Sequence, residues 1–372
     1  MKVLIRLDLN VPISNGEITD DSRISNYTQY IQSLCTNNKV CVITHLGRPK
    51  GEDPTLSTKK LKKSLEQHWK LEVIFVDSYD NTKIQSTISN LKKGQIILLE
   101  NTRFFEFEKA NDTKVAKQLA QCFDRFIFDA FSCSHRKHLS TNAITKFLPS
   151  TLGKTCTNEI INLQKALKLE NPLLVMGGAK AQTKLMLIDH FLDKASNILI
   201  GGVLANTFLK AQGFNIQESK YEPQLIKYCQ SLLQKPTSKK IILPIDFKVS
   251  NNLESDSYRT TEILKKNELI ADIGPKTTKK YIEIIRQSNG AIFNGPLGYI
   301  ENSIFQNSSV SIIEEISKLE QSYLGGGDTL KVLNLGQKKH SDFTFVSMAG
   351  GAMLEFLAHN GKLEVIENII KS

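Results

Sequence analysis

The chain has 372 residues, which is long for a single hydrophobic core, so two domains are expected. Hydrophobic residues make up 40% of the chain and charged residues 23%, as in globular proteins that are soluble in water. No apolar run reaches the roughly 18 residues that cross a bilayer, and the first apolar run is too short and too charged for a signal peptide. The composition therefore argues against a membrane-spanning protein and predicts no membrane partner.

The net charge of +10 leaves three explanations open: a lysine-rich solvated surface, polyanionic substrates, or nucleic acid. The lysines are spread along the chain, and no zinc finger, basic zipper or aromatic RNA-binding motif occurs, which argues against nucleic acid. The six cysteines are scattered without a CxxC pair, a pattern typical of reduced thiols. We expect a cytoplasmic protein that binds no nucleic acid.

Short aliphatic and β-branched runs alternate with segments whose apolar residues recur at helical spacing, for example residues 112–123. In the first half, strands are expected at 2–10, 39–46, 71–77, 95–101 and 125–131. In the second half, strands are expected at 172–178, 197–203, 239–247, 268–274, 290–296, 322–328 and 343–351. Because strands and helices alternate throughout, the sequence predicts an α/β fold with two doubly wound, Rossmann-like parallel sheets.

A domain boundary is expected where the stretch KFLPSTLGKT (146–155) gives way to a helical stretch, NEIINLQKALKLENP (158–172). We place the N-terminal domain at 1–155 and the C-terminal domain at 156–354. The second domain then includes a linker helix at about 157–170, which joins the two halves.

Polar side chains follow the expected strands of the first half, whereas glycines follow those of the second half. In open α/β sheets, ligands bind beyond the carboxyl ends of the strands. The first-half strand ends carry side chains that suit a small ligand with carboxylate and phosphate groups: Asp8, Asn10, His45, Arg48, Asn101, Arg103, His135 and Arg136. The second-half turns, such as GGAK and GGGDT, let backbone N–H groups and helix N-termini approach a polyphosphate. The sequence therefore predicts two anion sites, one in each domain.

Each motif taken alone also has a purely structural explanation. No GxxxxGK[ST] and no GxGxxG occurs, which disfavours a P-loop NTPase and a standard dinucleotide-binding fold. Lys180 and Lys184 lie four residues apart and would share one helix face if a helix starts there, as a phosphate site or as a solvated surface. In GGGDT, Asp328 would bind magnesium and Thr329 a phosphate oxygen, or both would cap a helix. Cys133, beside the basic cluster, fits a packed thiol better than an activated thiolate.

Taken in order, nine motifs resemble the motif set of the phosphoglycerate kinase family. They are RLDLNVP, THLGRP, ENTRF, DAFSCSHRKH, GGAKAQTKL, DIGPKT, FNGPLGYIE, GGGDT and SMAGGAMLE, and the resemblance runs from about residue 3 to beyond residue 360, nearly the whole chain. The resemblance implies reversible phosphoryl transfer between 1,3-bisphosphoglycerate with ADP and 3-phosphoglycerate with ATP, in glycolysis and gluconeogenesis. It also implies Mg²⁺ as cofactor, a monomer, a hinge and cleft between the domains, and a C-terminal tail (about 355–372) that packs on the N-terminal domain.

Carried over position by position, the resemblance implies a set of site residues in each domain. The 3-phosphoglycerate-binding set is Asp8, Asn10, Arg23, His45, Arg48, Arg103, His135 and Arg136. The nucleotide-binding set is Gly178, Lys180, Lys184, Gly202, Asn294, Pro296, Glu301, Gly326, Gly327, Asp328 and Thr329. Among these, Glu301 would hold the ribose and Asp328 the magnesium ion. The catalytic residues, which would contact the transferring phosphoryl group, are Arg23, Lys184, Gly350 and Gly351.

The implied acceptor is a carboxylate, which is already ionised at pH 7, so the reaction needs no general base. It needs charge neutralisation and in-line positioning of the two substrates. Because each domain would bind one substrate, the domains would have to close to bring the substrates together.

Several residues depart from the usual family motifs. They are Ser132, Cys133 and Ser134 in place of Gly-Thr-Ala, Val203 and Ala349 in place of glycines, Phe293 in place of tryptophan, and Met348 in place of threonine. A β-carbon on Ala349 would push a helix N-terminus away from the phosphoryl site. We predict a functional enzyme that is slower or altered in nucleotide preference. Two alternatives are a catalytically weak relative that serves as a binding or scaffold protein, and a kinase for a different small carboxylic acid; the intact charged residues argue against both.

Overall fold

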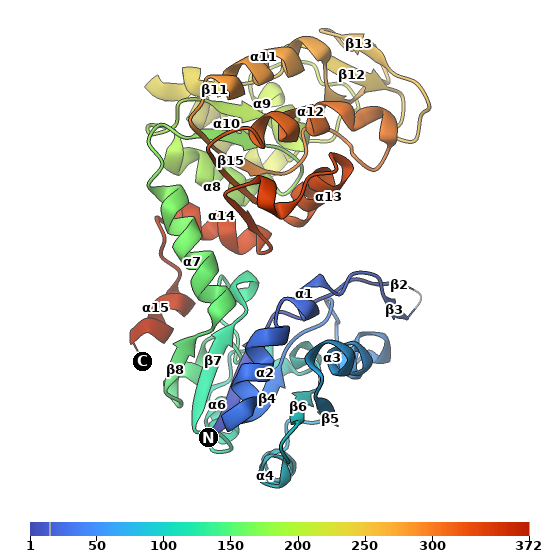
Figure 1. The fold of residues 1–372 in the computed structure, drawn as a ribbon. Helices are drawn as coiled ribbons and strands as arrows, with labels where there is room; N and C mark the ends of the chain where they lie inside the picture. Colours follow the sequence, from blue (N-terminus) through green and yellow to red (C-terminus); the bar gives the residue numbers. More distant parts are fainter. Residues whose placement is uncertain (15, 372) are drawn as a thin grey trace. The chain divides into compact units, whose positions relative to one another are not determined.

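The computed structural model describes residues 1–14 and 16–371, and these residues form two compact units. The first unit comprises Met1–Ile160 together with residues 362–371, and the second comprises Ile161–Gly361 (Figure 1). In the described part of the chain, every helix is too short or too polar to cross a membrane.

The observed unit boundaries differ by a few residues from the expected ones. The boundary between the two units lies between Ile160 and Ile161, whereas we expected it between residues 155 and 156. It falls inside helix α7 (Lys154–Leu167), which is continuous across the boundary. Helix α14 (Gly350–Ala358) packs against α8 (Ala181–Phe191) of the second unit, whereas α15 (Glu364–Lys371) packs against β8 (Ser150–Leu152) of the first. The part of the C-terminal tail that belongs to the first unit therefore begins at residue 362 and not at about 355.

The first unit is built on a parallel sheet in the order β5-β6-β4-β1-β7-β8. In chain order its strands are β1 (Lys2–Leu7), β4 (Lys39–Ile43), β5 (Glu72–Val76), β6 (Gln95–Leu99), β7 (Arg125–Asp129) and β8. A small hairpin of β2 (Ile13–Ser14) and β3 (Glu17–Ile18) follows β1. The helices are α1 (Ser22–Ser25), α2 (Thr28–Asn37), α3 (Lys62–Trp69), α4 (Asn81–Asn90), α5 (Glu106–Lys109) and α6 (Thr113–Ala120).

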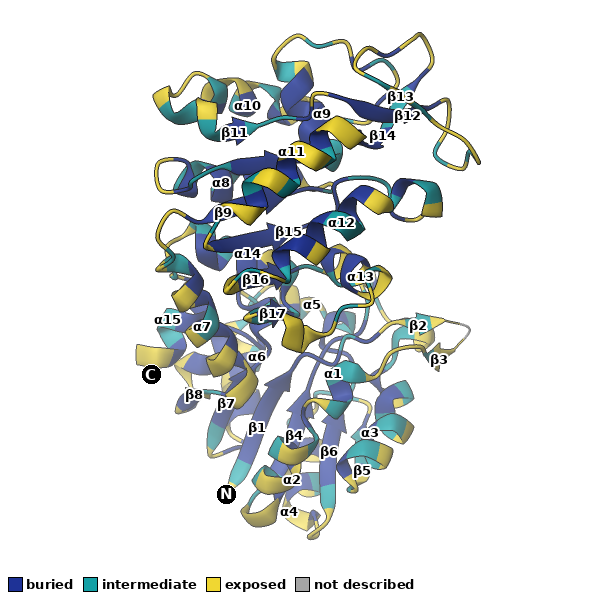
Figure 2. Ribbon diagram, turned by 45° about the horizontal axis from the view of Figure 1, so that its top comes forward, coloured by how far each residue is buried: buried dark blue, intermediate teal, exposed yellow. Residues whose placement is uncertain are grey.

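The strands of this sheet are buried on both faces. Ile5 of β1 joins one core cluster with Ile31 of α2 and Trp69 of α3. Because successive side chains of a strand alternate between faces, Leu4 and Arg6 point to the opposite face. Figure 2 shows the result as buried strands beside helices whose outer surfaces are exposed. Burial on both faces explains why these strands appear in the sequence as continuous apolar runs.

The second unit is built on another parallel sheet, in the order β11-β10-β9-β15-β16-β17. In chain order these are β9 (Leu173–Met176), β10 (Ile198–Ile200), β11 (Ile241–Ile242), β15 (Gly290–Asn294), β16 (Gln321–Gly325) and β17 (Phe345–Ser347). Its helices are α8, α9 (Gly202–Ala211), α10 (Ile226–Leu233), α11 (Pro275–Arg286), α12 (Asn307–Ile316), α13 (Gly327–Leu335) and α14. This is the strand order of a Rossmann sheet, which confirms the predicted doubly wound fold.

Helices cover both faces of the second sheet. Val175 of β9 and Phe293 of β15 share a core cluster with Ile312 of α12. On the opposite face, a Cβ built on Gly325 would lie 2.2 Å from the sulfur of Met353, so α14 contacts the end of β16 closely. The chain order of the strands reverses between β9 and β15, so the ligand crevice of such a fold lies at the carboxyl ends of these two strands.

A third, smaller sheet corrects the prediction that all strands are parallel. The expected strand at 268–274 forms as β14 (Leu269–Ile273), but it pairs antiparallel with β12 (Phe247–Ser250), which pairs antiparallel with β13 (Arg259–Thr261). The segment between β12 and β14 contains no helix, and a parallel crossover usually needs one. Likewise, the expected strand at 239–247 is divided between β11 and the start of β12.

Short 3₁₀ helices connect many of these elements. They are η1 (Pro54–Leu56), η2 (Thr58–Leu61), η3 (Thr102–Phe104), η4 (Phe131–Cys133), η5 (Ala143–Lys146), η6 (Pro223–Leu225), η7 (Pro236–Lys240), η8 (Ser303–Phe305) and η9 (His340–Asp342).

The start of α7 is fixed by a buried carboxylate. Asp129, the last residue of β7, accepts a hydrogen bond from the backbone N–H of Cys156 at 2.6 Å. Its backbone carbonyl accepts another from the Tyr27 hydroxyl, also at 2.6 Å. Burial raises the pKa of Asp129 to about 6, even though the N–H groups of Thr155 and Cys156 favour the charged form. A Cβ on Gly153 would lie 2.3 Å from that of Asp129, so glycine is required beside the carboxylate.

We predict that Asp129→Ala lowers the free energy of unfolding by about 1–2 kcal/mol, because α7 loses the acceptor at its first turn. Asp129→Asn should cost less, since an amide oxygen still accepts from Cys156 and no charge is buried. Urea unfolding at pH 7.5 measures both values. Asp112, the cap of α6, accepts hydrogen bonds from the backbone N–H groups of Lys114 and Val115. As a matched control, Asp112→Ala removes this cap and Asp112→Asn keeps it. Equal destabilisation by Asp129→Ala and Asp129→Asn would contradict the role of the cap.

Candidate functional site

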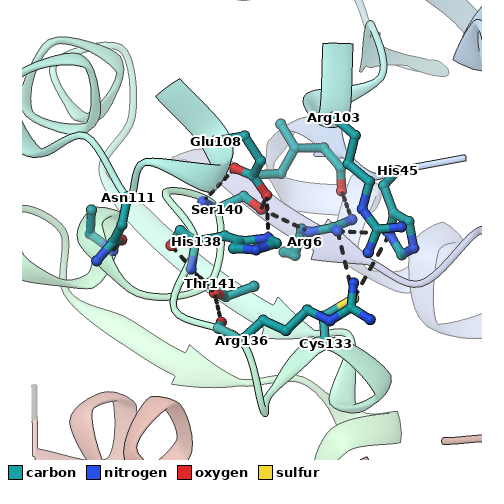
Figure 3. A network of polar contacts seen from close by, with 12 residues as sticks. Arg6, His45, Arg103, Glu108, Asn111, Cys133, Arg136, His138, Ser140 and Thr141 are labelled. Carbon is teal, nitrogen blue, oxygen red and sulfur yellow. Dashed lines mark hydrogen bonds and ion pairs between the residues drawn. The ribbon is translucent and has the colours of Figure 1, made fainter. Parts of the chain in front are cut away.

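Polar side chains from four strand ends come together at the carboxyl edge of the first sheet. Asp8 follows β1, His45 follows β4, Arg103 lies in η3 after β6, and Arg136 follows β7. Figure 3 shows His45, Arg103 and Arg136 directed toward the same space. The structure therefore brings together these sequence-predicted residues, because all strands of a parallel sheet end at the same edge.

Asp8 organises the loop that follows β1. Its carboxylate accepts hydrogen bonds from the side chains of Arg23 and Ser132 and forms an ion pair with Arg23. The same carboxylate accepts from the backbone N–H of Asn10 at 3.3 Å, and the Asn10 amide oxygen accepts from the N–H of Gly47 at 2.7 Å. Ser132, which stands where the family has glycine, is thus a second partner of Asp8.

Arg6 lies at the centre of this network, although the sequence analysis did not single it out (Figure 3). It is 1% exposed. Its Nε donates to Ser140 Oγ at 3.0 Å, its Nη1 to the carbonyl of Leu7 at 2.8 Å, and its Nη2 to His45 Nδ1 at 2.9 Å. The signal in the sequence was an arginine inside an apolar strand, since a charged side chain is almost never fully buried without partners.

The counter-charge to Arg6 is Glu108 of α5, which is also 1% exposed. Its Oε1 accepts from Ser140 Oγ at 2.6 Å, and its Oε2 accepts from the backbone N–H of Ser140 at 3.0 Å. Burial alone would raise the pKa of Glu108, but the hydrogen bonds from His138 and Ser140 and the charge of Arg6 outweigh it, so the pKa lies below its usual value. Ser140 therefore links a buried carboxylate to a buried guanidinium.

The two histidines of the predicted substrate set are neutral. A guanidinium only donates, so His45 Nδ1 accepts from Arg6 and the ring proton lies on Nε2. Burial, together with the charges of Arg6 and Arg103, lowers the pKa of His45 well below its usual value. Arg136 Nε donates to His135 Nε2 at 3.0 Å, and burial and the Arg136 charge lower the pKa of His135 to about 4. His45 thus carries an N–H donor and no positive charge.

The positive charge of the cluster comes from arginines. Burial, followed by the neighbouring charge of Arg136, lowers the pKa of Arg103 to about 10, which leaves the guanidinium protonated at neutral pH. Arg23 adds a third charge beside Asp8. Arg48 is exposed and takes no part in these hydrogen bonds. A small anion at this edge would meet several guanidinium groups and few carboxylates.

Two neighbouring polar residues serve the fold instead of the cluster. Asn101 is fully buried, and its amide donates to the carbonyls of Leu46 and Leu56 at 2.8 Å each. Lys137 pairs with Glu364 of α15 at 2.5 Å. The first contact joins loops at the sheet edge, and the second joins the C-terminal helix to the same unit.

We predict that His45 stays neutral, with its proton on Nε2, from pH 8 down to pH 5, because protonation would bury a second cation against Arg6. The chemical shifts of its ring nitrogens, assigned by comparison with a His45→Gln spectrum, report both the tautomer and the charge. We expect constant shifts over this range. A titration with a midpoint near 6.5, the value of an exposed histidine, would contradict the assignment.

Two adjoining pockets lie at the carboxyl edge of the second sheet. The larger has a volume of about 310 Å³ and a mostly apolar lining from β14 and from the turns after β9, β10 and β15. The smaller has a volume of about 190 Å³ and a lining of lysines, glycines and one acid. Ala179 and Asp328 line both pockets, so the two are continuous with each other. The residues of the predicted nucleotide set that line the smaller pocket are Lys180, Lys184, Asn294, Gly326, Gly327, Asp328 and Thr329, together with Gly350 and Gly351.

Lys184 is the buried cation of the smaller pocket, with 6% of its surface exposed. Its Nζ donates to the carbonyl of Ala179 at 3.0 Å and to the carbonyl of Gly177. Burial lowers its pKa to about 8, although the charges of Asp328 and Glu222 favour protonation. An anion in the pocket would raise the pKa of Lys184 back toward its usual value, because it would supply the close negative charge that the backbone carbonyls lack.

Lys180 does not share a helix face with Lys184, which corrects the expectation from their spacing. Helix α8 begins at Ala181, and Lys180 precedes it with a φ of 60°, outside the helical region. The first amide of the helix, that of Ala181, donates to Glu222 Oε1 at 2.9 Å. Both lysines nevertheless line the smaller pocket.

The turns after β9, β10 and β15 contact one another through the backbone. A Cβ on Gly177 would lie 2.1 Å from the carbonyl oxygen of Pro296, and one on Gly202 would lie 2.6 Å from the nitrogen of Gly178. Gly178, Gly202 and Gly295 have φ values of 69°, 58° and 89°, which favour glycine. The pockets therefore exist in this form because side chains are absent from these turns.

Asn294 and Thr329 are used within the fold. The Asn294 amide donates to the carbonyl of Gly325. Thr329 Oγ1 donates to the same carbonyl at 2.8 Å and accepts from the N–H of Gly295 at 2.8 Å. Thr329 is 1% exposed, and its single hydroxyl proton is engaged. In this conformation the hydroxyl holds the turn after β15 against the start of α13 and has no proton left for a phosphate.

Asp328 and Glu301, the predicted magnesium and ribose ligands, are both exposed and share one cation. Lys331 Nζ lies 3.0 Å from Asp328 Oδ1 and 3.5 Å from Glu301 Oε1. Lys331 was not among the residues predicted from the sequence, and the available signal was its i,i+3 spacing from Asp328. Within residues 1–14 and 16–371, no three His, Cys, Asp or Glu side chains form a group that could hold a metal. Asp328 fits Mg²⁺ as a single carboxylate ligand, because that ion completes its shell with phosphate oxygens and water.

The alanine at 349 leaves the start of α14 in place. Ala349 has a φ of −105°, which any residue adopts, and α14 begins at Gly350. Gly350 and Gly351 line the smaller pocket together with Lys184. The sequence-based concern that a β-carbon at 349 would push this helix away is therefore not supported by the geometry.

Sequence comparisons give one consistent result. A family model described as phosphoglycerate kinase matches residues 1–361. A phosphoglycerate kinase from Finegoldia magna is 41% identical over 372 residues, covering 96% of this chain and 93% of that protein. A phosphoglycerate kinase from Wolbachia pipientis subsp. Culex pipiens is 37% identical over 368 residues, covering 96% of this chain and 93% of that protein.

Comparison with solved structures extends the likeness to the fold. The structure of phosphoglycerate kinase from Coxiella burnetii matches with a TM-score of 0.83 and 32% identity, covering 100% of this chain and 96% of that one. The crystal structure of phosphoglycerate kinase from Pyrococcus horikoshii matches with a TM-score of 0.86 and 28% identity, covering 99% and 96%.

Proposed function

Because the chain belongs to the phosphoglycerate kinase family, we propose that its first unit binds 3-phosphoglycerate and its second unit binds ATP or ADP. The protein is a phosphotransferase that moves a phosphoryl group reversibly between 1,3-bisphosphoglycerate and ADP. The observation that carries the assignment of substrates is that the two sheets end in different kinds of anion site. The first offers guanidinium groups, and the second offers glycine turns around one buried ammonium.

In the first unit, Arg23, Arg103 and Arg136 supply the charges for the carboxylate and phosphate of 3-phosphoglycerate, since guanidinium forks match both groups. Asp8 holds Arg23, and we assign Arg23 to the carboxylate that accepts the phosphoryl group. His45 adds a neutral N–H donor. The remaining members of the proposed binding set are Asn10, Arg48 and His135.

In the second unit, the larger pocket suits the apolar base of the nucleotide, and the smaller pocket suits its phosphates. The pockets meet at Ala179 and Asp328, so one nucleotide can occupy both. Gly178, Gly202 and Pro296 line the larger pocket. Glu301 also lines it, and its carboxylate suits the ribose hydroxyls.

Asp328 would hold the magnesium ion that accompanies the nucleotide, and the ion would neutralise part of the phosphate charge. Lys180 and Lys184 add positive charge to the same pocket. Gly350 and Gly351 add the N-terminus of α14, whose backbone N–H groups favour negative charge. These residues would hold the transferring phosphoryl group without a covalent intermediate on the protein.

The reaction follows from charge and position. The acceptor carboxylate is ionised at neutral pH, so no residue has to remove a proton. Because the two substrate sets belong to different units, we propose that the units close about a hinge to align the substrates in line. Closure would also exclude water, which would otherwise accept the phosphoryl group.

Neither the contacts nor the comparisons favour the scaffold alternative, because the charged residues of both sites are present.

We further propose that the enzyme works as a monomer in the cytoplasm, with no nucleic-acid partner. All six cysteines are free and buried, which fits a reducing compartment.

We expect the purified protein to turn over 3-phosphoglycerate in an ATP-dependent manner in an assay coupled to consumption of 1,3-bisphosphoglycerate. Lys184→Met should lower kcat by about 10²–10³-fold, as for the loss of one charge-stabilising donor. Lys280→Met, which removes an exposed lysine from α11, is the matched control and should leave kcat unchanged. Absence of turnover by the unaltered protein, or an unchanged kcat in Lys184→Met, would contradict the proposal.

We also predict that ADP binds more weakly as the pH rises through 8. Lys184 loses its proton near pH 8 in the free protein, and the phosphates bind its charged form, so binding at higher pH must first restore the proton. At saturating magnesium, the Kd for ADP should rise by up to about tenfold between pH 7.5 and 9. Calorimetry measures this change, and Lys184→Met should show little dependence on pH. A constant Kd in the unaltered protein would contradict the role of Lys184.

A further inference from the structure

A lysine that neither family motif nor proposed mechanism uses lies between two acids of the nucleotide pockets. Lys331 is in the second turn of α13, three residues after Asp328, and Glu301 follows β15. The Lys331 ammonium is 3.0 Å from Asp328 Oδ1 and 3.5 Å from Glu301 Oε1. Asp328 lines both pockets, and Glu301 lines the larger. One internal cation therefore bridges the two carboxylates that the nucleotide and its metal ion would use.

We propose that Lys331 reduces the preference of this enzyme for metal-bound over metal-free nucleotide, by occupying the carboxylate of Asp328 whenever no metal ion is bound there. The inference rests on the proposed function, in which Asp328 is the magnesium ligand. It adds a residue that acts on metal affinity without contacting the reacting atoms.

Lys331 and a magnesium ion would compete for Asp328 because both are positively charged. Mg²⁺ bound directly to a carboxylate lies about 2.0–2.1 Å from its oxygen, and an ammonium 3.0 Å from the same oxygen would face two like charges at short range. A magnesium ion on Asp328 Oδ1 would therefore displace Lys331 from this oxygen, and the lost ion pair would weaken the apparent affinity for Mg²⁺.

The same contact has the opposite effect on nucleotide without metal. Phosphate groups that enter the smaller pocket approach Asp328, and a free carboxylate would repel them. With Lys331 beside it, the charge of Asp328 is largely neutralised, so metal-free ADP meets less repulsion. Lys331 thus narrows the difference in affinity between ADP with magnesium and ADP alone.

The size of the effect follows from exposure. The side chains of Lys331, Asp328 and Glu301 are 59%, 62% and 49% exposed. Exposed ion pairs change an equilibrium constant by a factor of about two to five, and salt screens them. What distinguishes Lys331 from other surface lysines is that both of its acidic partners line the pockets.

Calorimetry with the full chain tests the proposal by comparing the Kd for ADP in EDTA with the Kd for ADP in saturating magnesium chloride. Lys331→Met should weaken binding in EDTA by about two- to fivefold and lower the magnesium concentration for half-maximal tightening by a similar factor. Lys331→Arg, which keeps the charge, should restore both values, and 0.5 M salt should reduce both differences. Lys280→Met is the control for loss of one positive charge.

The outcomes separate this inference from the proposed function. Asp328→Asn should abolish most of the magnesium effect; if the effect persists, Asp328 is not the ligand, and both the metal assignment and the role of Lys331 are overturned. If Asp328→Asn abolishes the effect but Lys331→Met leaves the ratio of the two Kd values unchanged, or Lys280→Met changes it equally, the role of Lys331 alone is overturned.

Discussion

The charge of Arg6 is buried inside a parallel strand, and much of the carboxyl edge of the first sheet follows from the need to compensate it. Water does not reach the guanidinium, so its N–H groups use Ser140, the carbonyl of Leu7 and the ring of His45. Glu108 completes the neutralisation through Ser140. Burial, followed by the charge of Arg6, lowers the pKa of His45 and keeps it neutral, and the hydrogen bond from Arg6 fixes its tautomer. Removal of Arg6 would leave Glu108 with Ser140 and His138 as partners and would remove the donor that fixes the tautomer of His45, so one cation of the fold also affects a residue of the candidate site.

The second unit meets the same requirement in a different way. Lys184 is buried without a carboxylate in direct contact, and two backbone carbonyls accept its hydrogen bonds. Carbonyl dipoles compensate a charge less than a carboxylate does, which is why burial lowers the pKa of Lys184 to about 8. The incomplete compensation leaves room for an anionic ligand to act as the missing counter-charge. In the first unit the buried cation is satisfied internally and positions its neighbours, whereas in the second the buried cation would be satisfied by the phosphates of the proposed nucleotide.

The parallel strands were predictable because burial on both faces makes them continuous apolar runs, and the grouping of the candidate site residues was predictable because they follow those strands directly. Features that depend on a distant partner were not. Glu108 gives no local sign that it compensates Arg6, and Glu301 gives none that it shares Lys331 with Asp328. The antiparallel sheet was missed for a related reason, since β12 and β14 have the composition of any buried strand and only the missing helix between them reveals their pairing.

The departures from the family motifs occur where the backbone does not require glycine. None of Ser132, Val203 and Ala349 has a positive φ, so a β-carbon is accommodated at each position without backbone strain. The glycines with positive φ around the pockets are all retained, at Gly178, Gly202, Gly295, Gly326 and Gly350. At Gly327 and Gly351 a Cβ would meet no atom within 4 Å, so the absence of a side chain there keeps pocket space open. The positions at which this chain has a β-carbon in place of a motif glycine are therefore ones at which the backbone conformation does not require glycine.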